Sequence, residues 1–379
     1  MKLINFFLST DISLGIGIFD NVCQYIEKFD KKKLGIIYDS NLNDNNYFLK
    51  NLDKINKKYP RSVNVINELN SEPTYSYLEK IRNEFDKHQP DIIIAIGGGS
   101  TMDIGKGVAL LLKNDVPAIS LKGFPKNVND PLPLITIPSM FGSGGEVSYY
   151  AVFIDEVEGK KFGINTKKNT PVKSIIDPLL TMSAPISTVI SSAMDSLVHC
   201  VDSFGSVKGT TFSRMFSVEG FKNTFNALLK KELDDPASRI DLAIGSICGL
   251  TALMNSCDGP TNGLAYYFGV KDKIAHGMAG AIFLKEVMNW NYRNGYKEYY
   301  KLLEMNSFDS IDDINNEFFN KLDDLYKKLN IPTLANFGYK TENAVMLAEN
   351  SSKDKIDSFS GNPITFNKES ALEVIQNLI

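Results

Sequence analysis

Three side chains of this sequence could together hold a metal ion. Asp195 and His199 lie four residues apart in an apolar, helix-like pattern, so they would share one helix face with Cβ atoms about 6 Å apart. A carboxylate and an imidazole placed in this way can bind a divalent ion, although the same spacing also suits an ion pair on a helix surface. His276 precedes Gly277 and further small residues, which suggests a helix start that packs closely on a neighbour. Two of the 3 histidines of the chain lie in these motifs, so we predict a metal site of Asp195, His199 and His276.

A second chemical signal is a glycine turn between an expected strand and an expected helix. Residues 92–96 form a continuous, mostly β-branched apolar run, as in a parallel strand covered on both faces. The three glycines at 97–99 leave no side chain between the backbone and a ligand. Ser100 and Asp103 have capping-box spacing, so we expect the helix to begin at Ser100 and its free amides to bind phosphate.

This turn departs from the common phosphate-binding motifs. Met102 stands where the third glycine of G-x-G-x-x-G belongs, and Gly107 stands where a P-loop has Ser or Thr. Asp39, at the carboxyl end of a strand expected at 33–40, could bond ribose hydroxyls and repel a 2′-phosphate, which favours NAD over NADP. The alternatives are a purely structural glycine turn and an Asp39 that only starts a loop or caps a helix.

The order of the expected elements indicates two domains. Strand-like and helix-like segments alternate up to about residue 180, as in an α/β fold with a parallel sheet, and long helical stretches follow. We therefore expect an α/β dinucleotide-binding domain at 1–180 and an all-α metal- and substrate-binding domain at 181–379. The first should contain helices at 18–29 and 74–88, strands at 33–40, 63–66, 92–96, 118–120, 133–138 and 149–154, and a closing strand and turn at 174–180.

Composition limits the partners and the location of the protein. The 379 residues are 43% hydrophobic and 23% charged, enough to bury a large core. The net charge is −4 without a block of Lys and Arg, so nucleic acid is not an expected partner. The N-terminus lacks a signal-peptide layout and no apolar run reaches about 18 residues, so a membrane is not expected either. The 4 cysteines form no Cys-x-x-Cys pair, which suggests a reducing, cytoplasmic location.

Several motifs occur together in one order: GGGS-x-x-D at 97–103, Asp-Pro at 177–178, M-D-x-x-x-H at 194–199, H-G-x-x-x-A at 276–281 and Asn-Pro at 362–363. Over essentially its whole length the chain thereby resembles the iron-containing (group III) alcohol dehydrogenases. The resemblance implies an NAD-dependent enzyme with a divalent ion, Zn or Fe, that acts on a small alcohol or aldehyde as a homodimer or larger assembly. It implies cofactor contacts at Asp39, Gly97, Gly98, Gly99, Ser100, Asp103, Ser139, Ser143 and Lys161, and metal ligation by Asp195, His199 and His276.

Two of the implied cofactor contacts have simpler alternatives. Ser139 and Ser143 belong to a glycine-serine loop at 139–146 that could be a plain connection, and Met140 and Phe141 replace smaller residues of the usual pattern there. Lys161 could be an ordinary surface lysine.

The chain departs from the family where further histidines are usual, because Asn262 and Tyr266 stand in their places. An amide oxygen is a weak ligand. Tyr266 would have to lose its proton to bind an ion, but it could relay a proton in catalysis or simply fill the core. Asp258 could supply an oxygen ligand if the helix continues through 259–260, and otherwise it is a loop or capping acid. Three protein ligands suffice in many catalytic zinc sites. The sequence does not decide whether the ion is iron or zinc.

The resemblance also suggests a reaction. The ion would act as a Lewis acid on the alcohol, whose hydride passes to the nicotinamide. The runs at 194–204, 209–213 and 263–266 look like the branch that oxidises the C8 hydroxyl of 3-deoxy-D-manno-octulosonate, which would place the protein in lipopolysaccharide or other surface-glycan biosynthesis. Relatives of dehydroquinate synthase share the architecture but need a basic cluster for a substrate phosphate, which is not evident here. A non-catalytic NAD- or metabolite-binding protein with a decayed metal site would also explain the missing histidines.

Overall fold

The structure, a computed structural model, describes residues 3–69, 72–229, 232–306 and 309–379. It divides into two compact units. The α/β unit comprises Leu8–Pro185 and Asp234–Ile240, and the helical unit comprises Met1–Phe7, Ile186–Leu233 and Asp241–Ile379. The division after Pro185 lies five residues beyond the position expected from the sequence.

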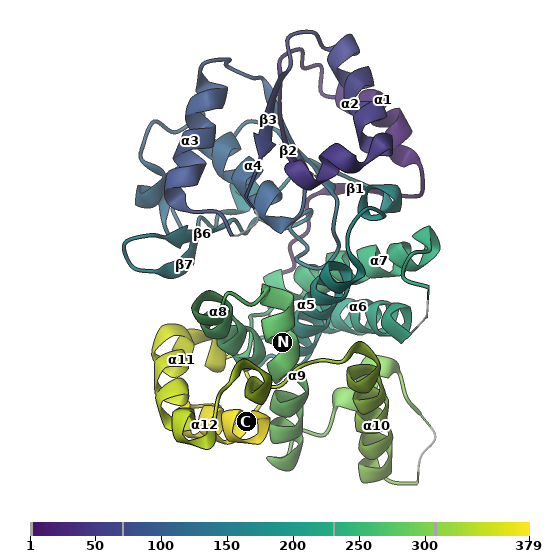
Figure 1. Ribbon diagram of the computed structural model, residues 1–379, viewed down its shortest axis with the longest axis vertical. Coiled ribbons are helices and arrows are strands. Elements are labelled where there is room, and N and C mark those ends of the chain that lie inside the picture. The colour runs from purple at the N-terminus through teal and green to yellow at the C-terminus, as the bar shows by residue number, and fades with distance from the viewer. Residues whose placement is uncertain (1–2, 70–71, 230–231, 307–308) are drawn as a thin grey trace. The chain divides into compact units, whose positions relative to one another are not determined.

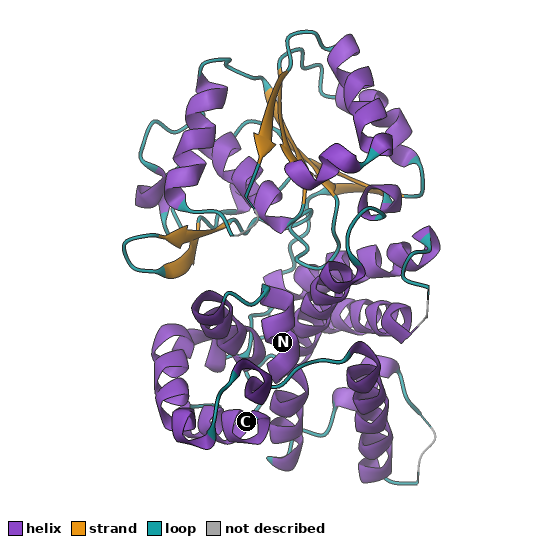
Figure 2. Ribbon diagram, viewed as in Figure 1, coloured by secondary structure: helices purple, strands orange, loops and turns teal. Residues whose placement is uncertain are grey.

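The α/β unit is built on a parallel six-stranded sheet with the order β1-β8-β5-β4-β2-β3 (Figures 1 and 2). A separate antiparallel pair, β6-β7, forms a hairpin. The strands are β1 (Asp11–Leu14), β2 (Leu34–Asp39), β3 (Val63–Asn67), β4 (Ile92–Gly97), β5 (Leu134–Pro138), β6 (Val152–Asp155), β7 (Lys160–Gly163) and β8 (Lys173–Ile176). The helices are α1 (Val22–Glu27), α2 (Asn46–Lys58), α3 (Tyr75–Asp86) and α4 (Gly99–Leu111), with short 3-10 helices at Ile18–Asn21, Ser40–Asp44, Ala118–Leu121, Lys167–Asn169 and Pro178–Thr181. This architecture confirms the expected fold class.

The central strand β4 is buried on both faces because its side chains alternate between two apolar cores. Ile92, Ile94 and Ile96 pack into the core on the side of α1 and α2, whereas Ile93 and Ala95 pack into the core on the side of α3 and α4. A strand that contributes to two cores must be apolar at every position, which explains the uninterrupted run in the sequence.

Two expected elements differ in the structure. The strand expected at 118–120 is a 3-10 helix, Ala118–Leu121, which follows Pro117. The helix expected at 18–29 is divided into a 3-10 turn, Ile18–Asn21, and the short α1. Helix α3 forms as expected, and the Thr74 side chain accepts a hydrogen bond from the Tyr77 amide at its start.

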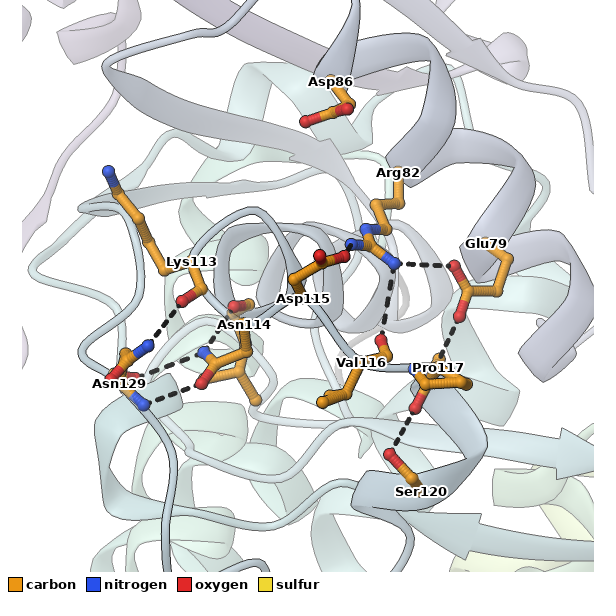
Figure 3. A network of polar contacts seen from close by, with 12 residues as sticks. Glu79, Arg82, Asp86, Lys113, Asn114, Asp115, Val116, Pro117, Ser120 and Asn129 are labelled. Carbon is orange, nitrogen blue, oxygen red and sulfur yellow. Dashed lines mark hydrogen bonds and ion pairs between the residues drawn. The ribbon is translucent and has the colours of Figure 1, made fainter.

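Polar contacts tie the far end of α4 to its surroundings (Figure 3). On α3, Arg82 donates to the Val116 carbonyl at 3.4 Å and pairs with Asp115 at 3.2 Å. Asn114 exchanges hydrogen bonds with Asn129, whose backbone amide donates to the Asn114 side chain at 2.7 Å. These contacts hold the connection after α4 and thereby fix the helix that follows the glycine turn.

The helical unit consists of α5 (Ile186–Gly205), α6 (Thr211–Leu229), α7 (Pro236–Met254, whose first residues belong to the α/β unit), α8 (Pro260–Asp272), α9 (His276–Arg293), α10 (Ile311–Leu329), α11 (Ala344–Phe359) and α12 (Lys368–Leu378). Short 3-10 helices lie at Tyr299–Leu303, Leu334–Phe337 and Thr341–Asn343. Helix α7 is long and apolar enough to cross a membrane by length and composition alone, although Arg239 and Asp241 interrupt its apolar run. Most of its apolar window is buried inside the fold, as in an ordinary core helix.

Glycines allow other helices to approach α5 closely. A Cβ added to Gly277 of α9 would lie 2.0 Å from the Ser191 carbonyl oxygen, and one added to Gly280 would lie 2.8 Å from Val198. On α6, a Cβ at Gly220 would lie 2.8 Å from the Cys200 sulfur. The glycine of the His-Gly motif is therefore required for α9 to reach α5.

Asp177, at the end of β8, joins several segments of the α/β unit. Its buried carboxylate accepts hydrogen bonds from the amides of Gly17, Phe19 and Leu179 and from the Tyr47 hydroxyl, at 2.8–3.1 Å. One acid therefore ties together the segment at 17–19, the 3-10 helix Pro178–Thr181 and helix α2.

We expect Asp177→Ala to lower the free energy of unfolding by about 3 kcal/mol or more, because buried donors would lose a charged acceptor. Tyr47→Phe removes only one of these hydrogen bonds and should cost about 1 kcal/mol. Chemical denaturation of both variants measures the difference, and equal losses would contradict the role given to Asp177.

Candidate functional site

The ends of three neighbouring strands bring together the expected nucleotide contacts. Asp39 ends β2, Gly97 ends β4 and Ser139 follows β5, and β4 pairs with both of the other strands. The Ser139 amide donates to the Gly97 carbonyl at 3.0 Å, and a Cβ on Gly97 would lie 3.0 Å from the Asp39 Cβ. Open α/β sheets bind ligands at this carboxyl edge.

The glycine turn starts α4 one residue earlier than expected. Gly98 is the N-cap and α4 begins at Gly99, so the predicted capping box of Ser100 and Asp103 is wrong. No side chain caps this helix end. The Asp103 carboxylate instead accepts from the Val152 amide at 3.0 Å. The amides of the first turn thus remain available to an anion.

The three glycines meet different surroundings. A Cβ on Gly97 would lie 2.6 Å from the Thr101 hydroxyl oxygen, and one on Gly99 would lie 2.9 Å from the Ser143 hydroxyl oxygen. A Cβ on Gly98 would meet no atom within 4 Å. Packing of the folded chain therefore explains glycine at 97 and 99, but it gives no reason for glycine at 98.

Asp39 makes contacts typical of a capping acid. Its Oδ1 accepts from the backbone amide of Asn41 at 3.0 Å and from the Asn41 side chain at 2.8 Å. This is the helix-cap alternative considered from the sequence. A contact with ribose through the remaining oxygen stays a prediction.

A buried lysine joins α4 to the segment that follows the second glycine loop. Lys106 is fully buried, and its Nζ donates to the Tyr150 carbonyl at 2.7 Å and to the Ser148 hydroxyl at 3.3 Å. Burial lowers the pKa of Lys106 and raises the pKa of Asp103 to about 6, while their mutual attraction at 3.5 Å opposes both shifts. Asp103, expected to contact the cofactor, thus holds Lys106 and the loop that leads into β6.

Lys161 lies on β7 and is 7% exposed, so the surface-lysine alternative is wrong. Its Nζ pairs with a Glu72 carboxylate oxygen at 2.6 Å. Whether it also contacts a cofactor stays a prediction.

The three expected metal ligands converge within the helical unit. Oδ1 of Asp195 lies 3.7 Å from His199 Nε2 and 3.8 Å from His276 Nε2. Ligands of one ion at bond lengths near 2.1 Å stand roughly 3.0–3.5 Å apart, so the observed separations are slightly wide. Accordingly, the His, Cys, Asp and Glu side chains of the described residues include no closed group of three that already fits an ion.

The chemistry of these donors fits a divalent ion. His199 is 5% exposed, yet its Nδ1 has no hydrogen-bond partner among the described residues, and its Nε2 faces the Asp195 carboxylate beyond hydrogen-bond distance. Leaving a buried polar atom unpaired costs about 1–3 kcal/mol. A cation between Asp195 and the imidazoles would use the donor atoms that face one another.

The two altered positions lie beside this cluster. Asn262, on α8, is 2% exposed, and its Oδ1 lies 2.9 Å from His276 Nε2, a hydrogen bond if that nitrogen carries the proton. The ring of Tyr266, one turn later, lies 4.7 Å from the His276 ring. Both residues therefore contact His276.

Asp258 does not meet the condition set for a ligand. Helix α8 begins at Pro260 with Gly259 as its N-cap, so Asp258 precedes the helix. Its Oδ2 accepts from the Ser358 hydroxyl at 2.9 Å. Because proline occupies the first position of α8, Asp258 has the loop position given as its alternative role.

Sequence reasoning missed Asp202, seven residues after Asp195 on α5. Its buried carboxylate accepts from the amides of Gly259 and Asn262, both at 3.0 Å. Burial raises the pKa of Asp202 to about 7 against the opposing effect of these hydrogen bonds. The spacing Asp195, His199, Asp202 is a helical-face pattern, and it is the one signal in the sequence that could have pointed to this residue.

Family models match both parts of the chain. The iron-containing alcohol dehydrogenase model matches residues 9–178, and the C-terminal model of the same family matches residues 189–379. An alcohol dehydrogenase of Thermococcus barophilus is 28% identical over 367 residues, which covers 88% of this chain and 94% of that protein.

Solved structures share the fold. A 1,3-propanediol oxidoreductase superposes with a TM-score of 0.90 at 21% identity, and the NAD⁺ complex of sulfoacetaldehyde reductase from Bifidobacterium kashiwanohense with 0.88 at 19%. Both alignments cover 100% of this chain, with 100% of the first structure and 99% of the second. Together with the family models, these findings confirm the resemblance inferred from the motifs: the chain belongs to the iron-containing alcohol dehydrogenase family, a group of metal-containing, NAD-dependent enzymes that act on alcohols.

Proposed function

We propose that this enzyme interconverts a primary alcohol and an aldehyde on a sugar, sugar acid or polyol, with the ion held by Asp195, His199 and His276. The observation that carries this proposal is the convergence of one carboxylate and two imidazoles, with a buried His199 that has no other polar use in the described structure. A bound Zn²⁺ or Fe²⁺ would supply a Lewis acid that polarises the oxygen of the substrate.

The residues around the ion site suggest how a proton is handled. The Tyr266 ring packs against the imidazole of His276, so its hydroxyl group is our candidate for a proton relay. Ligation through Nε2 requires the proton of the neutral imidazole to reside on Nδ1, so the contact of His276 with Asn262 must change when an ion binds.

The glycine turn supports nucleotide binding in the α/β unit. The open first turn of α4 offers amides and a partial positive charge to a pyrophosphate, and Gly98 leaves room for it. Ser143 lies against Gly99 and brings the second glycine loop to the same place. Asp39 at the end of β2 favours NAD over NADP, since a carboxylate repels a 2′-phosphate.

For the substrate we propose 3-deoxy-D-manno-octulosonate, oxidised at C8 for surface-glycan biosynthesis. The support is the run of residues at 194–204, 209–213 and 263–266 and the replacement of a usual histidine by Asn262. A small anionic substrate is compatible with this fold, as the name of sulfoacetaldehyde reductase indicates for that relative.

We further propose a cytoplasmic homodimer or larger assembly that binds neither nucleic acid nor membrane. The four cysteines, Cys23, Cys200, Cys248 and Cys257, are free thiols, which suits a reducing compartment.

A screen of NADH production tests the substrate proposal. Purified protein is stripped of metal, supplied with Zn²⁺, Fe²⁺ or no metal, and offered 3-deoxy-ulosonates, aldoses and polyols. We expect ion-dependent turnover that is fastest with the 3-deoxy-ulosonate. NAD binding without turnover or recruitment of an ion would instead favour the second candidate, a non-catalytic binding protein, which the replacement of histidines by Asn262 and Tyr266 motivates.

We expect Asp195→Ala and His199→Ala to lower kcat at least about 100-fold and to retain NAD affinity, because they remove ion ligands only. His88→Ala, which alters the one histidine outside the ion motifs, is the matched control and should behave as the wild type. Steady-state kinetics and NAD titration measure both effects, and unchanged turnover in either ligand variant would refute the metal assignment.

We expect Gly98→Ala to weaken NAD binding by about 10-fold or more while Tm stays within a degree or two. The added methyl meets no protein atom within 4 Å and lies where the pyrophosphate would approach. Gly97→Ala is the contrasting variant, since its Cβ would clash with Thr101 and lower Tm. Wild-type NAD affinity in Gly98→Ala would place the nucleotide elsewhere.

A further inference from the structure

Asp202 occupies the place of a capping side chain for a helix to which it does not belong. Helix α8 has glycine as its N-cap, and no side chain of its own caps its first amides. The carboxylate of Asp202 reaches across from α5 and accepts hydrogen bonds from Gly259 and Asn262 at 3.0 Å each. Charged acceptors at a helix start are favourable because they meet both free amides and the positive end of the helix dipole.

The fit between the two helices leaves no room for a side chain at the cap. A Cβ added to Gly259 would lie 2.7 Å from both Cγ and Oδ1 of Asp202. A helix start with its own capping side chain would exclude this carboxylate. The glycine and the acid are therefore two parts of one contact.

This contact leads back to the ion site. The amide of Asn262 bonds Asp202, and the side chain of Asn262 bonds His276 at 2.9 Å. His276 in turn faces Asp195, two helical turns before Asp202 on α5. The contacts thus form a ring that leaves α5, passes through α8 and α9, and returns to α5.

We propose that Asp202 is a positioning residue for the ion site: by capping α8 it fixes Asn262, whose side chain contacts His276 Nε2 in the ion-free protein and holds the imidazole facing Asp195 until an ion takes that nitrogen. The proposal rests on the metal function proposed above. Asp202 is not proposed as an ion ligand, because its Oδ2 accepts both hydrogen bonds from the start of α8.

Co²⁺ binding to metal-free protein tests the proposal, because the visible spectrum of Co²⁺ reports ligand geometry without any turnover. We expect Asp202→Ala to bind Co²⁺ about 10–100-fold more weakly, with an altered spectrum, as for other residues that orient ligands. Asp202→Asn keeps an oxygen acceptor but loses the charge, so we expect a several-fold loss.

The matched control removes a tie at the other end of the same helix. The Tyr339 hydroxyl bonds the Asp272 carboxylate at 2.7 Å at the end of α8, and Tyr339→Phe should lower Tm without changing Co²⁺ affinity. Wild-type affinity in the folded Asp202 variants, or in Asp202→Asn alone if Asp202→Ala does not fold, would overturn the proposal. An equal loss in Tyr339→Phe would do the same. Failure of the wild-type protein to bind Co²⁺ would instead reject the metal function itself.

Discussion

The helical unit depends on the burial of α5, a helix that carries several polar side chains into the protein interior. Buried polar groups require partners, and a folded chain must supply them from neighbouring helices. Glycines on α6 and α9 let those helices approach α5 closely, and Asp202 accepts hydrogen bonds from the start of α8, which has no capping side chain of its own. Among the described residues, His199 Nδ1 on this helix has no such partner, and the Nε2 atoms of His199 and His276 face Asp195 Oδ1 at 3.7 and 3.8 Å. The buried polar groups of α5 are therefore only partly satisfied, because His199 Nδ1 and Ser203 Oγ have no hydrogen-bond partner among the described residues.

In the α/β unit, too, some residues serve packing and others are left for ligand binding. Its sheet places three strand ends together, and the buried charges of Lys106 and Asp103 hold the segment that leads into β6 against α4. Burying a lysine is unfavourable unless nearby oxygens compensate, which the Tyr150 carbonyl and Asp103 do. The exposed part of the turn is left with few side chains, so that the backbone itself can bind a ligand.

The sequence predicted most of this architecture, because its strongest signals are local. Apolar runs gave strand β4, and helical spacing placed Asp195 and His199 on one face. The errors came where a tertiary contact overrides a local pattern. The Ser100 capping box does not form because Asp103 is used by Lys106 and Val152. Asp202 was missed for the same reason, since its partners lie more than fifty residues away in the chain.

The proposed ion ligands lie on two different helices, and this has a consequence for the stability of the protein. Asp195 and His199 come from α5 and His276 from α9, so an ion bound to all three would link helices that the chain connects only through long intervening segments. A ligand that binds the folded state and not the unfolded chain stabilises the folded state in proportion to the logarithm of its free concentration. The supply of metal would therefore set the thermal stability and the lifetime of this protein as well as its chemistry.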